Sequence, residues 1–285
     1  MLPFHPYGLI ISLAVLSAYL TVYFRRKKYG FSATDLENLF LYIVPLAIIG
    51  ARIYHVVDKW GYYQQNLGEI IAVWNGGLGI YGAILGGVFG LFIFLKIYKV
   101  DAIASTMTIY KMLDLIIPGL ALGQAVGRWG NFFNHEVFGG PTKLPWGWFI
   151  PENLRPEFWK NDSYFHPTFA YESLWVFLGF IVLLIVERKM LSSTFQFFPG
   201  SKSLSASGGS GCDSSKIKNV SPHFSYGTLT AIYAAWYGVG RFFLEFLRFD
   251  TAEAGGVKVA QIISLVLVVW GGGRLYRMLV TSVTQ

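Results

Sequence analysis

The amino-acid sequence predicts an all-α integral membrane protein, a bundle of about seven transmembrane helices. Of its 285 residues, 54% are hydrophobic and 14% are charged, with a mean hydropathy of +0.47, whereas soluble domains carry about 25% charged residues. Seven apolar stretches are long enough, or nearly so, to cross a hydrocarbon core about 30 Å thick. That many apolar runs leave too little polar surface for a soluble fold. They lie at 8–24, 37–57, 70–97, 112–128, 167–187, 226–247 and 257–273.

The charges outside these stretches predict the topology. Basic residues gather after the first span, between the third and fourth, between the fifth and sixth, and after the seventh, whereas the intervening loops hold few. Because lysine and arginine are retained on the cytoplasmic side, this alternation places the N-terminus outside and the C-terminus in the cytoplasm. It also accounts for the net charge of +7, so we expect no nucleic-acid partner.

The first and third spans have distinct local signals. The stretch 8–24 has no basic segment before it and no small-residue cleavage site after it, which predicts a retained helix. The stretch 70–97 contains Gly82-x-x-x-Gly86-x-x-x-Gly90, which places small residues on one helix face and allows another helix to approach closely. Gly76 and Gly77 either serve the same packing or mark a break at which the backbone approaches a ligand.

Two polar excursions interrupt the spans of what we expect to be a single membrane domain of residues 1–285. Residues 131–166 are rich in Pro, Trp and Gly, which is typical of a compact loop or small head at the outer headgroup level. Residues 191–223 are rich in Ser and Gly and predict a flexible cytoplasmic linker. Cys212, the one cysteine in the chain, lies in this linker, and a single cysteine forms no internal disulfide.

A polar cluster follows the fourth span, where residues 127–139 read Gly-Arg-Trp-Gly-Asn-Phe-Phe-Asn-His-Glu-Val-Phe-Gly. A charged side chain at the membrane is costly, so it normally has a partner and a function. The guanidinium of Arg128 presents a rigid fork of donors that suits phosphate. The alternative is a structural pair between Arg128 and Glu136 that ties the loop to the helix end.

The sixth span carries a second cluster. Tyr237, Arg241, Glu245 and Arg248 follow the spacing i, i+4, i+8, i+11, which is one stripe of a helix. Such a stripe cannot face lipid, so it lines an interior cavity or pairs with another helix. Two arginines for one glutamate leave a positive charge that fits an anionic ligand; a structural ladder of ion pairs is the alternative.

These segments resemble the prolipoprotein diacylglyceryl transferase family. Residues 127–139 match its signature Gly-Arg-x-Gly-Asn-Phe-x-Asn-x-Glu-x-x-Gly, and Tyr237-Gly-x-x-Arg241-Phe-x-x-Glu245-Phe-x-Arg248 resembles its later motif. Three further segments fit the same family and spread the resemblance over most of the spans. They are Pro6-Tyr7-Gly8-Leu9, Gly50-Ala51-Arg52 and His166-Pro167-Thr-x-x-Tyr171-Glu172.

The resemblance implies a multi-pass enzyme of the bacterial cytoplasmic membrane whose active site faces the outer leaflet. Its substrates are phosphatidylglycerol and the lipobox-containing signal peptide of a prolipoprotein. The lipobox cysteine receives the diacylglyceryl group as a thioether, and glycerol phosphate leaves. Arg128 and Arg241 are the first choices for the catalytic residues that hold the phosphate. The residues expected to bind phosphatidylglycerol are Arg128, Asn131, Asn134, Glu136, Gly139, Tyr237, Arg241, Glu245 and Arg248.

One position departs from the family pattern. Tyr81 stands where the family usually has a histidine that is often assigned as the catalytic base. A tyrosine hydroxyl, with an ordinary pKa of about 10, must lose its own proton before it accepts one from a thiol. Tyr81 either acts in that form, or donates a hydrogen bond to phosphate, or another group is the base. Tyr7 and Glu172 are candidates for that base, and His135 and His166 are nearby in sequence.

The sequence leaves two alternatives to an active transferase. One is a degenerate paralogue of the family without activity. The other is a non-enzymatic transporter or lipid-binding protein, in which the charged stripe lines a substrate path. The sequence contains no Cys/His set with metal-ligand spacing and no nucleotide-binding loop. We therefore expect no metal and no cofactor.

Overall fold

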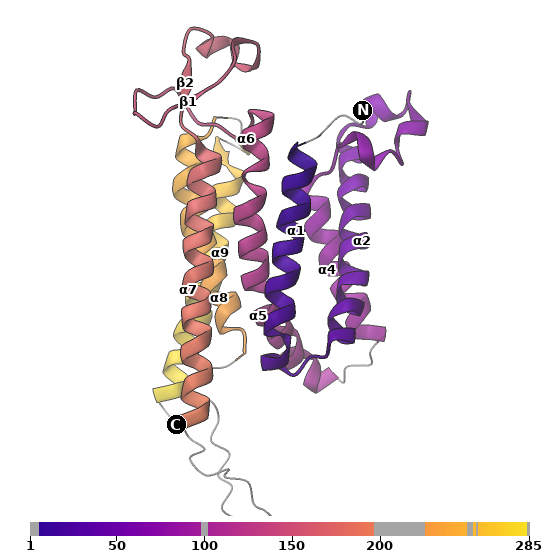
Figure 1. The fold of residues 1–285 in the computed structure, drawn as a ribbon, viewed down its shortest axis with the longest axis vertical. Coiled ribbons are helices and arrows are strands. Elements are labelled where there is room, and N and C mark those ends of the chain that lie inside the picture. The colour runs from indigo at the N-terminus through magenta and orange to yellow at the C-terminus, as the bar shows by residue number, and fades with distance from the viewer. Residues whose placement is uncertain (1–5, 98–101, 197–225, 250–252, 255, 284–285) are drawn as a thin grey trace, which may run out of the picture. The chain divides into compact units, whose positions relative to one another are not determined.

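The computed structural model describes residues 6–97, 102–196, 226–249, 253–254 and 256–283, and these are mostly helical (Figure 1). Within these residues, six helices are long and apolar enough to cross a membrane. A further helix, α8, has 17 residues and continues into a 3-10 turn, η7 (Glu245–Leu247). The predicted all-α membrane fold is confirmed. The long helices are α1 (Pro6–Arg25), α2 (Ala33–Asp58), α4 (Ile80–Ile97), α5 (Ala102–Gly127), α7 (Thr168–Gln196), α8 (Thr228–Leu244) and α9 (Val259–Val283).

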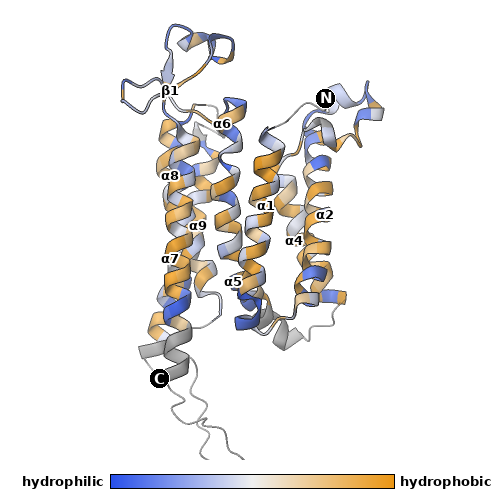
Figure 2. Cartoon of the chain, in the orientation of Figure 1, coloured by the Kyte–Doolittle hydropathy of each residue, from blue (hydrophilic) through white to orange (hydrophobic). Residues whose placement is uncertain are grey.

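The long helices consist mainly of hydrophobic residues, and hydrophilic residues gather towards the helix ends (Figure 2). On α1, Leu9, Leu13 and Leu16 are each about half exposed. A soluble protein rarely exposes apolar surface on this scale. Because a helix satisfies its own backbone hydrogen bonds, the same surface is suited to contact with lipid tails.

The chain divides into two compact units. One comprises residues 1–22 and 113–285, and the other comprises residues 23–112. The single domain over residues 1–285 stays a prediction. Helix α7 continues to Gln196, beyond its predicted end at 187, and the rest of the predicted linker 191–223 lies outside the described residues.

In the unit of residues 23–112, α2 and α4 pack closely because glycines remove side chains from their contact. A methyl group placed on Gly82 would lie 2.1 Å from the Gly50 carbonyl oxygen, and one on Gly86 would lie 2.1 Å from the Leu46 carbonyl oxygen. Neither position has room for a side chain. The close helix approach predicted from the spacing of Gly82, Gly86 and Gly90 is confirmed.

The predicted start of the third span is wrong. The sequence predicts a span over 70–97, whereas α4 begins at Ile80. The short helix α3 (Trp60–Tyr63) and the 3-10 turns η2 (Leu67–Glu69) and η3 (Val73–Asn75) precede it. Gly76 and Gly77 then adopt φ values of +84° and +71°, which glycine tolerates and other residues do not.

The backbone at this break surrounds the buried guanidinium of Arg52. Arg52 donates to the carbonyl oxygens of Glu69, Ile70, Gly76 and Gly77 over distances of 2.5–3.0 Å. The anticipated break is therefore present, and in the structure the group that the backbone approaches is an arginine of α2.

In the unit of residues 1–22 and 113–285, Asp114 of α5 fixes the start of α8. Its carboxylate accepts hydrogen bonds from the N–H groups of Gly227 and Thr230 and from the Thr230 hydroxyl at 2.6–2.8 Å. The carboxylate satisfies N–H groups that the helix leaves unpaired and complements the helix dipole. The buried apolar core that α5, α7 and α8 share consists of Ile117, Ala121, Ala125, Val176, Leu183 and Leu229.

Trp175 of α7 and Trp236 of α8 set the spacing of these two helices. Each indole N–H donates to the backbone carbonyl of the other tryptophan at 2.9 Å, and the two rings stack with centroids 4.6 Å apart. Gly240 leaves the room for this pair, because a methyl group at that position would lie 2.1 Å from Trp175 Nε1. The pair therefore depends on glycine at 240.

Residues 131–166 form a small folded head at one end of α7 (Figure 1). Its two strands, β1 (Trp148–Phe149) and β2 (Tyr164–Phe165), pair antiparallel with Trp148 opposite Phe165. The head begins with the short helix α6 (Gly130–Asn134), and its position outside the membrane stays a prediction. A second two-stranded pair, β3 (Glu253–Ala254) and β4 (Val257–Lys258), precedes α9. The buried centre of the head consists of Phe138, Ile150 and Phe165, with Trp148, Trp159 and Phe249 against it.

Candidate active site

The carboxylate of Glu172 is the centre of a buried charged cluster. Arg128 Nη2 lies 2.5 Å from Glu172 Oε2, and Arg241 Nη1 lies 2.7 Å from Glu172 Oε1. Arg248 Nη1 lies 3.5 Å from the same Oε1. Glu172 is only 4% exposed, so these contacts are shielded from water and the charges act on one another strongly.

The cluster is assembled from segments far apart in the sequence. Arg128 follows the last residue of α5, Glu172 lies in the first turns of α7, and Arg241 lies in the last turn of α8. The prediction that one helix stripe runs from Tyr237 to Arg248 is wrong beyond Leu244, because η7 and then extended backbone at Arg248 replace the helix. Arg248 nevertheless reaches Glu172.

Glu245 holds Arg241 from the other side. Its Oε2 lies 2.7 Å from Arg241 Nη2, and the side chain is fully buried. This ion pair lacks the geometry of a hydrogen bond, and neither carboxylate oxygen of Glu245 accepts a hydrogen bond from a described residue. Lys258 Nζ donates to the backbone carbonyls of Glu245, at 2.7 Å, and of Arg248, and so fixes the chain where the helix ends.

The signature segment turns sharply after α6. His135 and Val137 have φ values of +51° and +58°, which are unusual for residues other than glycine and costly for a β-branched one. The Thr168 hydroxyl donates to the Val137 carbonyl at 2.7 Å, and the Phe169 N–H donates to it at 3.2 Å. The start of α7 therefore stabilises the strained turn.

The other signature residues differ in their surroundings. Asn131 is buried, whereas the Asn134 amide donates to Glu136 Oε1 at 3.3 Å on an exposed surface. Gly139 has no room for a side chain, because a methyl group there would lie 2.7 Å from the Leu247 carbonyl oxygen. Close packing of the head against η7 thus accounts for Gly139.

Tyr7 of α1 lies against the signature segment. A methyl group placed on Gly130 would lie 2.9 Å from Tyr7 Cδ2, so the ring rests directly on the backbone of α6. Tyr7 is 39% exposed. The structure therefore brings the first family motif and the signature together, and leaves part of the tyrosine ring uncovered.

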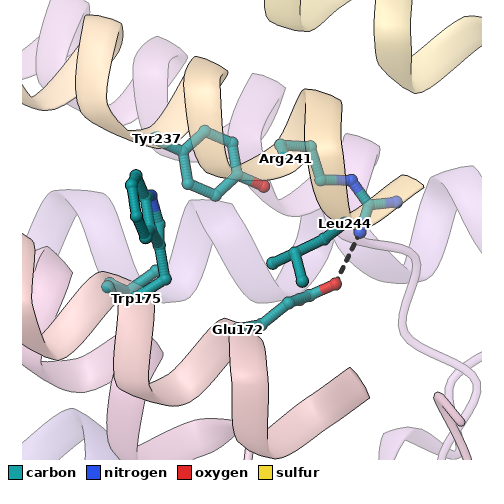
Figure 3. A pocket seen from close by; sticks show the side chains of 6 residues that line it. Glu172, Trp175, Tyr237, Arg241 and Leu244 are labelled. Atoms are coloured by element: carbon teal, nitrogen blue, oxygen red, sulfur yellow. Dashed lines mark hydrogen bonds and ion pairs between the residues drawn. The ribbon is translucent and has the colours of Figure 1, made fainter. Parts of the chain in front are cut away.

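A small pocket, with about 210 Å³ of space that includes open solvent, lies beside the cluster (Figure 3). The Glu172 and Arg241 side chains point towards each other across it from α7 and α8, and their ion pair forms its polar side. The pocket therefore presents an ion pair beside apolar side chains. The residues that line it are Glu172, Trp175, Val176, Tyr237, Arg241 and Leu244.

Tyr81 and the two histidines have separate surroundings. Tyr81 lies in the first turn of α4, in the unit of residues 23–112; it is 47% exposed, and its ring centroid is 5.7 Å from that of Tyr54. The His135 ring stacks on Trp148 at 5.3 Å. His166 Nδ1 lies 3.3 Å from the Tyr171 hydroxyl. The catalytic role of Tyr81 stays a prediction.

Sequence reasoning missed several residues that support the site. None of them belongs to a motif that the sequence singled out: Trp175, Trp236, Lys258 and Asp114. Asp114 carried the clearest signal, since an acidic residue inside an apolar helix normally has a partner. No group of three or more His, Cys, Asp or Glu side chains able to hold a metal ion occurs among the described residues.

Fold and site together define a class: a multi-pass membrane protein with a buried guanidinium cluster next to an amphipathic pocket. The model of the family described as prolipoprotein diacylglyceryl transferase matches residues 1–204 and 215–277. The chain therefore belongs to the prolipoprotein diacylglyceryl transferase family, and it is a transferase.

Relatives of this chain bear the corresponding name, phosphatidylglycerol–prolipoprotein diacylglyceryl transferase. The protein of Thermosynechococcus vestitus is 36% identical over 274 residues, which cover 95% of this chain and 87% of that protein. The protein of Acaryochloris marina is 38% identical over 265 residues, 91% of this chain and 81% of that protein. The protein of Listeria innocua is 36% identical over 265 residues, 92% and 81% respectively. These likenesses disfavour a transporter or a lipid-binding protein without activity.

Proposed function

We propose that this protein transfers the diacylglyceryl group of phosphatidylglycerol to the lipobox cysteine of prolipoproteins, with release of glycerol phosphate. The observation that carries the proposal is the convergence of Arg128, Arg241 and Arg248 on one buried carboxylate. Guanidinium groups so arranged suit a phosphate. The names of the relatives supply the two substrates.

The reaction needs positive charge where the phosphate departs. When the bond between the glyceryl carbon and the phosphate oxygen breaks, its electron pair stays on that oxygen. Fixed donors at that place stabilise the transition state, and in a buried site they act more strongly than in water. Arg128 and Arg241 are our choices for this role.

The thiol must lose its proton, since the thiolate is the nucleophile. Three residues are candidates for taking that proton: Tyr81, Tyr7 and Glu172. A tyrosine hydroxyl ordinarily titrates about 1.5 units above a thiol, near 10 against 8.5. A tyrosine therefore serves as a base only in its deprotonated form.

We further propose that the site faces the outer leaflet of the bacterial cytoplasmic membrane, with the N-terminus outside. The alternation of basic loops supports this topology. We expect the remaining signature and stripe residues to contact the lipid headgroup, directly or through the arginines. They are Asn131, Asn134, Glu136, Gly139, Tyr237, Glu245 and Arg248.

Transfer by the purified protein tests the proposal. Vesicles of phosphatidylglycerol and a lipobox peptide are expected to give a thioether-modified peptide, detected by mass spectrometry. Arg241→Ala is expected to lower the rate by about 10²-fold or more, the usual effect of removing a donor to developing charge. Arg241→Lys keeps the positive charge but loses the two-pronged guanidinium. Its transfer rate is expected to lie between those of the wild type and of Arg241→Ala.

Two controls sharpen this test. Arg277→Ala removes an exposed arginine of α9 and is expected to leave the rate unchanged. Phosphatidylethanolamine in place of phosphatidylglycerol is expected to give little product. Full activity of a folded Arg241→Ala protein would show that the phosphate role is wrong.

A further inference from the structure

Glu172 occupies the place in the arginine cluster where an anionic ligand would bind. Guanidinium nitrogens of three arginines lie close to its carboxylate oxygens: that of Arg128 at 2.5 Å, that of Arg241 at 2.7 Å and that of Arg248 at 3.5 Å. Several guanidinium groups around anionic oxygens are the arrangement expected around a phosphate. The donors that the substrate phosphate needs are therefore directed at a side chain of the protein itself.

The adjoining pocket places the two anions in competition. Glu172 and Arg241 line it together, from α7 and α8 (Figure 3). A phosphate that enters this pocket and contacts Arg241 also lies against the Glu172 carboxylate. Glu245 already occupies Arg241 Nη2, at 2.7 Å, so a phosphate must take the Nη1 atom that Glu172 holds. Two anions in contact within a buried site repel each other strongly, so the phosphate competes with ionised Glu172 for that atom.

We propose that the substrate phosphate displaces Glu172 from Arg128 and Arg241, and that the released carboxylate accepts the proton of the substrate thiol. The proposal rests on the proposed function. A carboxylate that loses cationic partners and gains an anionic neighbour binds a proton more readily. The thiol is the proton donor that the reaction itself brings to the site, so lipid binding prepares the base that the second substrate needs.

The step balances in atoms and charge. The S–H bond breaks, its proton goes to a Glu172 oxygen, and the sulfur electron pair forms the bond to the glyceryl carbon. The bond between that carbon and the phosphate oxygen breaks, and its electron pair stays on the phosphate beside Arg128 and Arg241. Glu172 then passes its proton to the departing glycerol phosphate. The regained carboxylate re-forms its ion pairs with the arginines, which favours release of the product.

Kinetics of Glu172→Gln distinguish this role from a purely structural one. The amide keeps the shape but does not compete as an anion, so the KM for phosphatidylglycerol is expected to fall at least about threefold. The kcat is expected to fall by about 10²-fold or more, because the proton acceptor is gone. Loss of a structural ion pair alone would raise the KM. Glu187→Gln, the same change at another buried carboxylate of α7, is expected to leave both constants unchanged.

Binding of inorganic phosphate tests the displacement without catalysis. Phosphate is expected to raise the unfolding temperature of Glu172→Gln more than that of the wild type, in which it must first displace the carboxylate. If the amide variant does not fold, Glu172→Asp takes its place. Its side chain is shorter by one methylene, which draws the carboxylate back from the arginines. Both the KM and the kcat are expected to fall, each by a smaller factor than in Glu172→Gln.

Three results would overturn the proposal: equal phosphate shifts in wild type and variant, an unchanged kcat in the variant, or a raised KM. Failure of the proposed function looks different. In that case the wild type itself yields no thioether from phosphatidylglycerol, while the phosphate shifts still report whether displacement occurs.

Discussion

At the scale of single residues, the site is defined by three guanidinium groups around one buried carboxylate. Arg128, Arg241 and Arg248 contact Glu172, and Glu245 holds Arg241 from the other side. Because guanidinium groups in this arrangement suit a phosphate, the cluster fits the phosphodiester of phosphatidylglycerol.

A single substitution at position 81 distinguishes Tyr81 from Glu172 as the proton acceptor. Tyr81→Phe removes only the hydroxyl, and we expect the transfer rate to stay within about threefold of wild type, because general-base loss costs about 10²-fold or more. The measurement is the initial rate of thioether formation at saturating peptide.

A hundredfold loss in Tyr81→Phe that Tyr81→His restores would place the base at position 81 and contradict the role assigned to Glu172. A matched check is Tyr164→Phe. Tyr164 is an exposed tyrosine of the head, and its hydroxyl has no part in the proposed chemistry.

At the scale of helices, the cluster depends on how closely α7 and α8 approach. Glu172 lies about one turn before Trp175, and Gly240 is the neighbour of Arg241. The reciprocal hydrogen bonds of Trp175 and Trp236, at 2.9 Å, fix the helices at the depth where Glu172 meets Arg241. Each such bond contributes about 1 kcal/mol, so the pair supports both the fold and the site.

Gly240→Ala tests this dependence. The added methyl group would lie 2.1 Å from Trp175 Nε1, and Trp175 cannot yield without losing its bond to Trp236. We expect a loss of about 1–3 kcal/mol in unfolding free energy, as for other overpacked sites, together with a lower transfer rate. Thermal unfolding in detergent and the transfer assay measure the two effects.

Gly272→Ala on α9 is the matched control, since a methyl group there meets nothing within 4 Å. Alanine is favoured over glycine in helices by up to about 1 kcal/mol, so this variant is expected to be neutral or slightly more stable. Equal behaviour of the two alanine variants would show that the tryptophan pair does not set the helix spacing.

At the scale of the whole molecule, the distribution of charge along the chain predicts its orientation. The arginine cluster and Tyr7 belong to the unit of residues 1–22 and 113–285, and Arg52 and Tyr81 belong to the unit of residues 23–112. The proposed topology places the head of residues 131–166 outside and the linker 191–223 in the cytoplasm. Cys212, which lies in that linker, is the one cysteine of the chain.

Labelling with a membrane-impermeant maleimide tests this topology. In spheroplasts, Cys212 is expected to stay unlabelled until the membrane is permeabilised. With Cys212 replaced by serine, Asp162→Cys in the exposed surface of the head is expected to react without permeabilisation. The reverse pattern would invert the topology and place the site at the inner leaflet.

Local signals in the sequence determined the membrane class, the approximate spans, the close approach of another helix to the glycines of α4, and the family. Hydropathy, glycine spacing and motif spacing act over a few turns of chain, so one sequence suffices to read them. They failed where a helix end depends on a distant partner: α4 begins at Ile80 because the preceding backbone surrounds Arg52, and α8 gives way to η7, where Lys258 binds the carbonyls of Glu245 and Arg248.

Only the tertiary structure decided that Glu172 is the shared partner of three arginines. Positions 128, 172, 241 and 248 come from the turn after α5, from α7, from α8 and from an extended segment, and no periodicity links position 172 to the other three. Their meeting depends on packing between helices, above all on the paired tryptophans and the glycine at 240. The sequence thus identified the charged residues of the site, whereas the packing of α5, α7 and α8 determined which of them face one another.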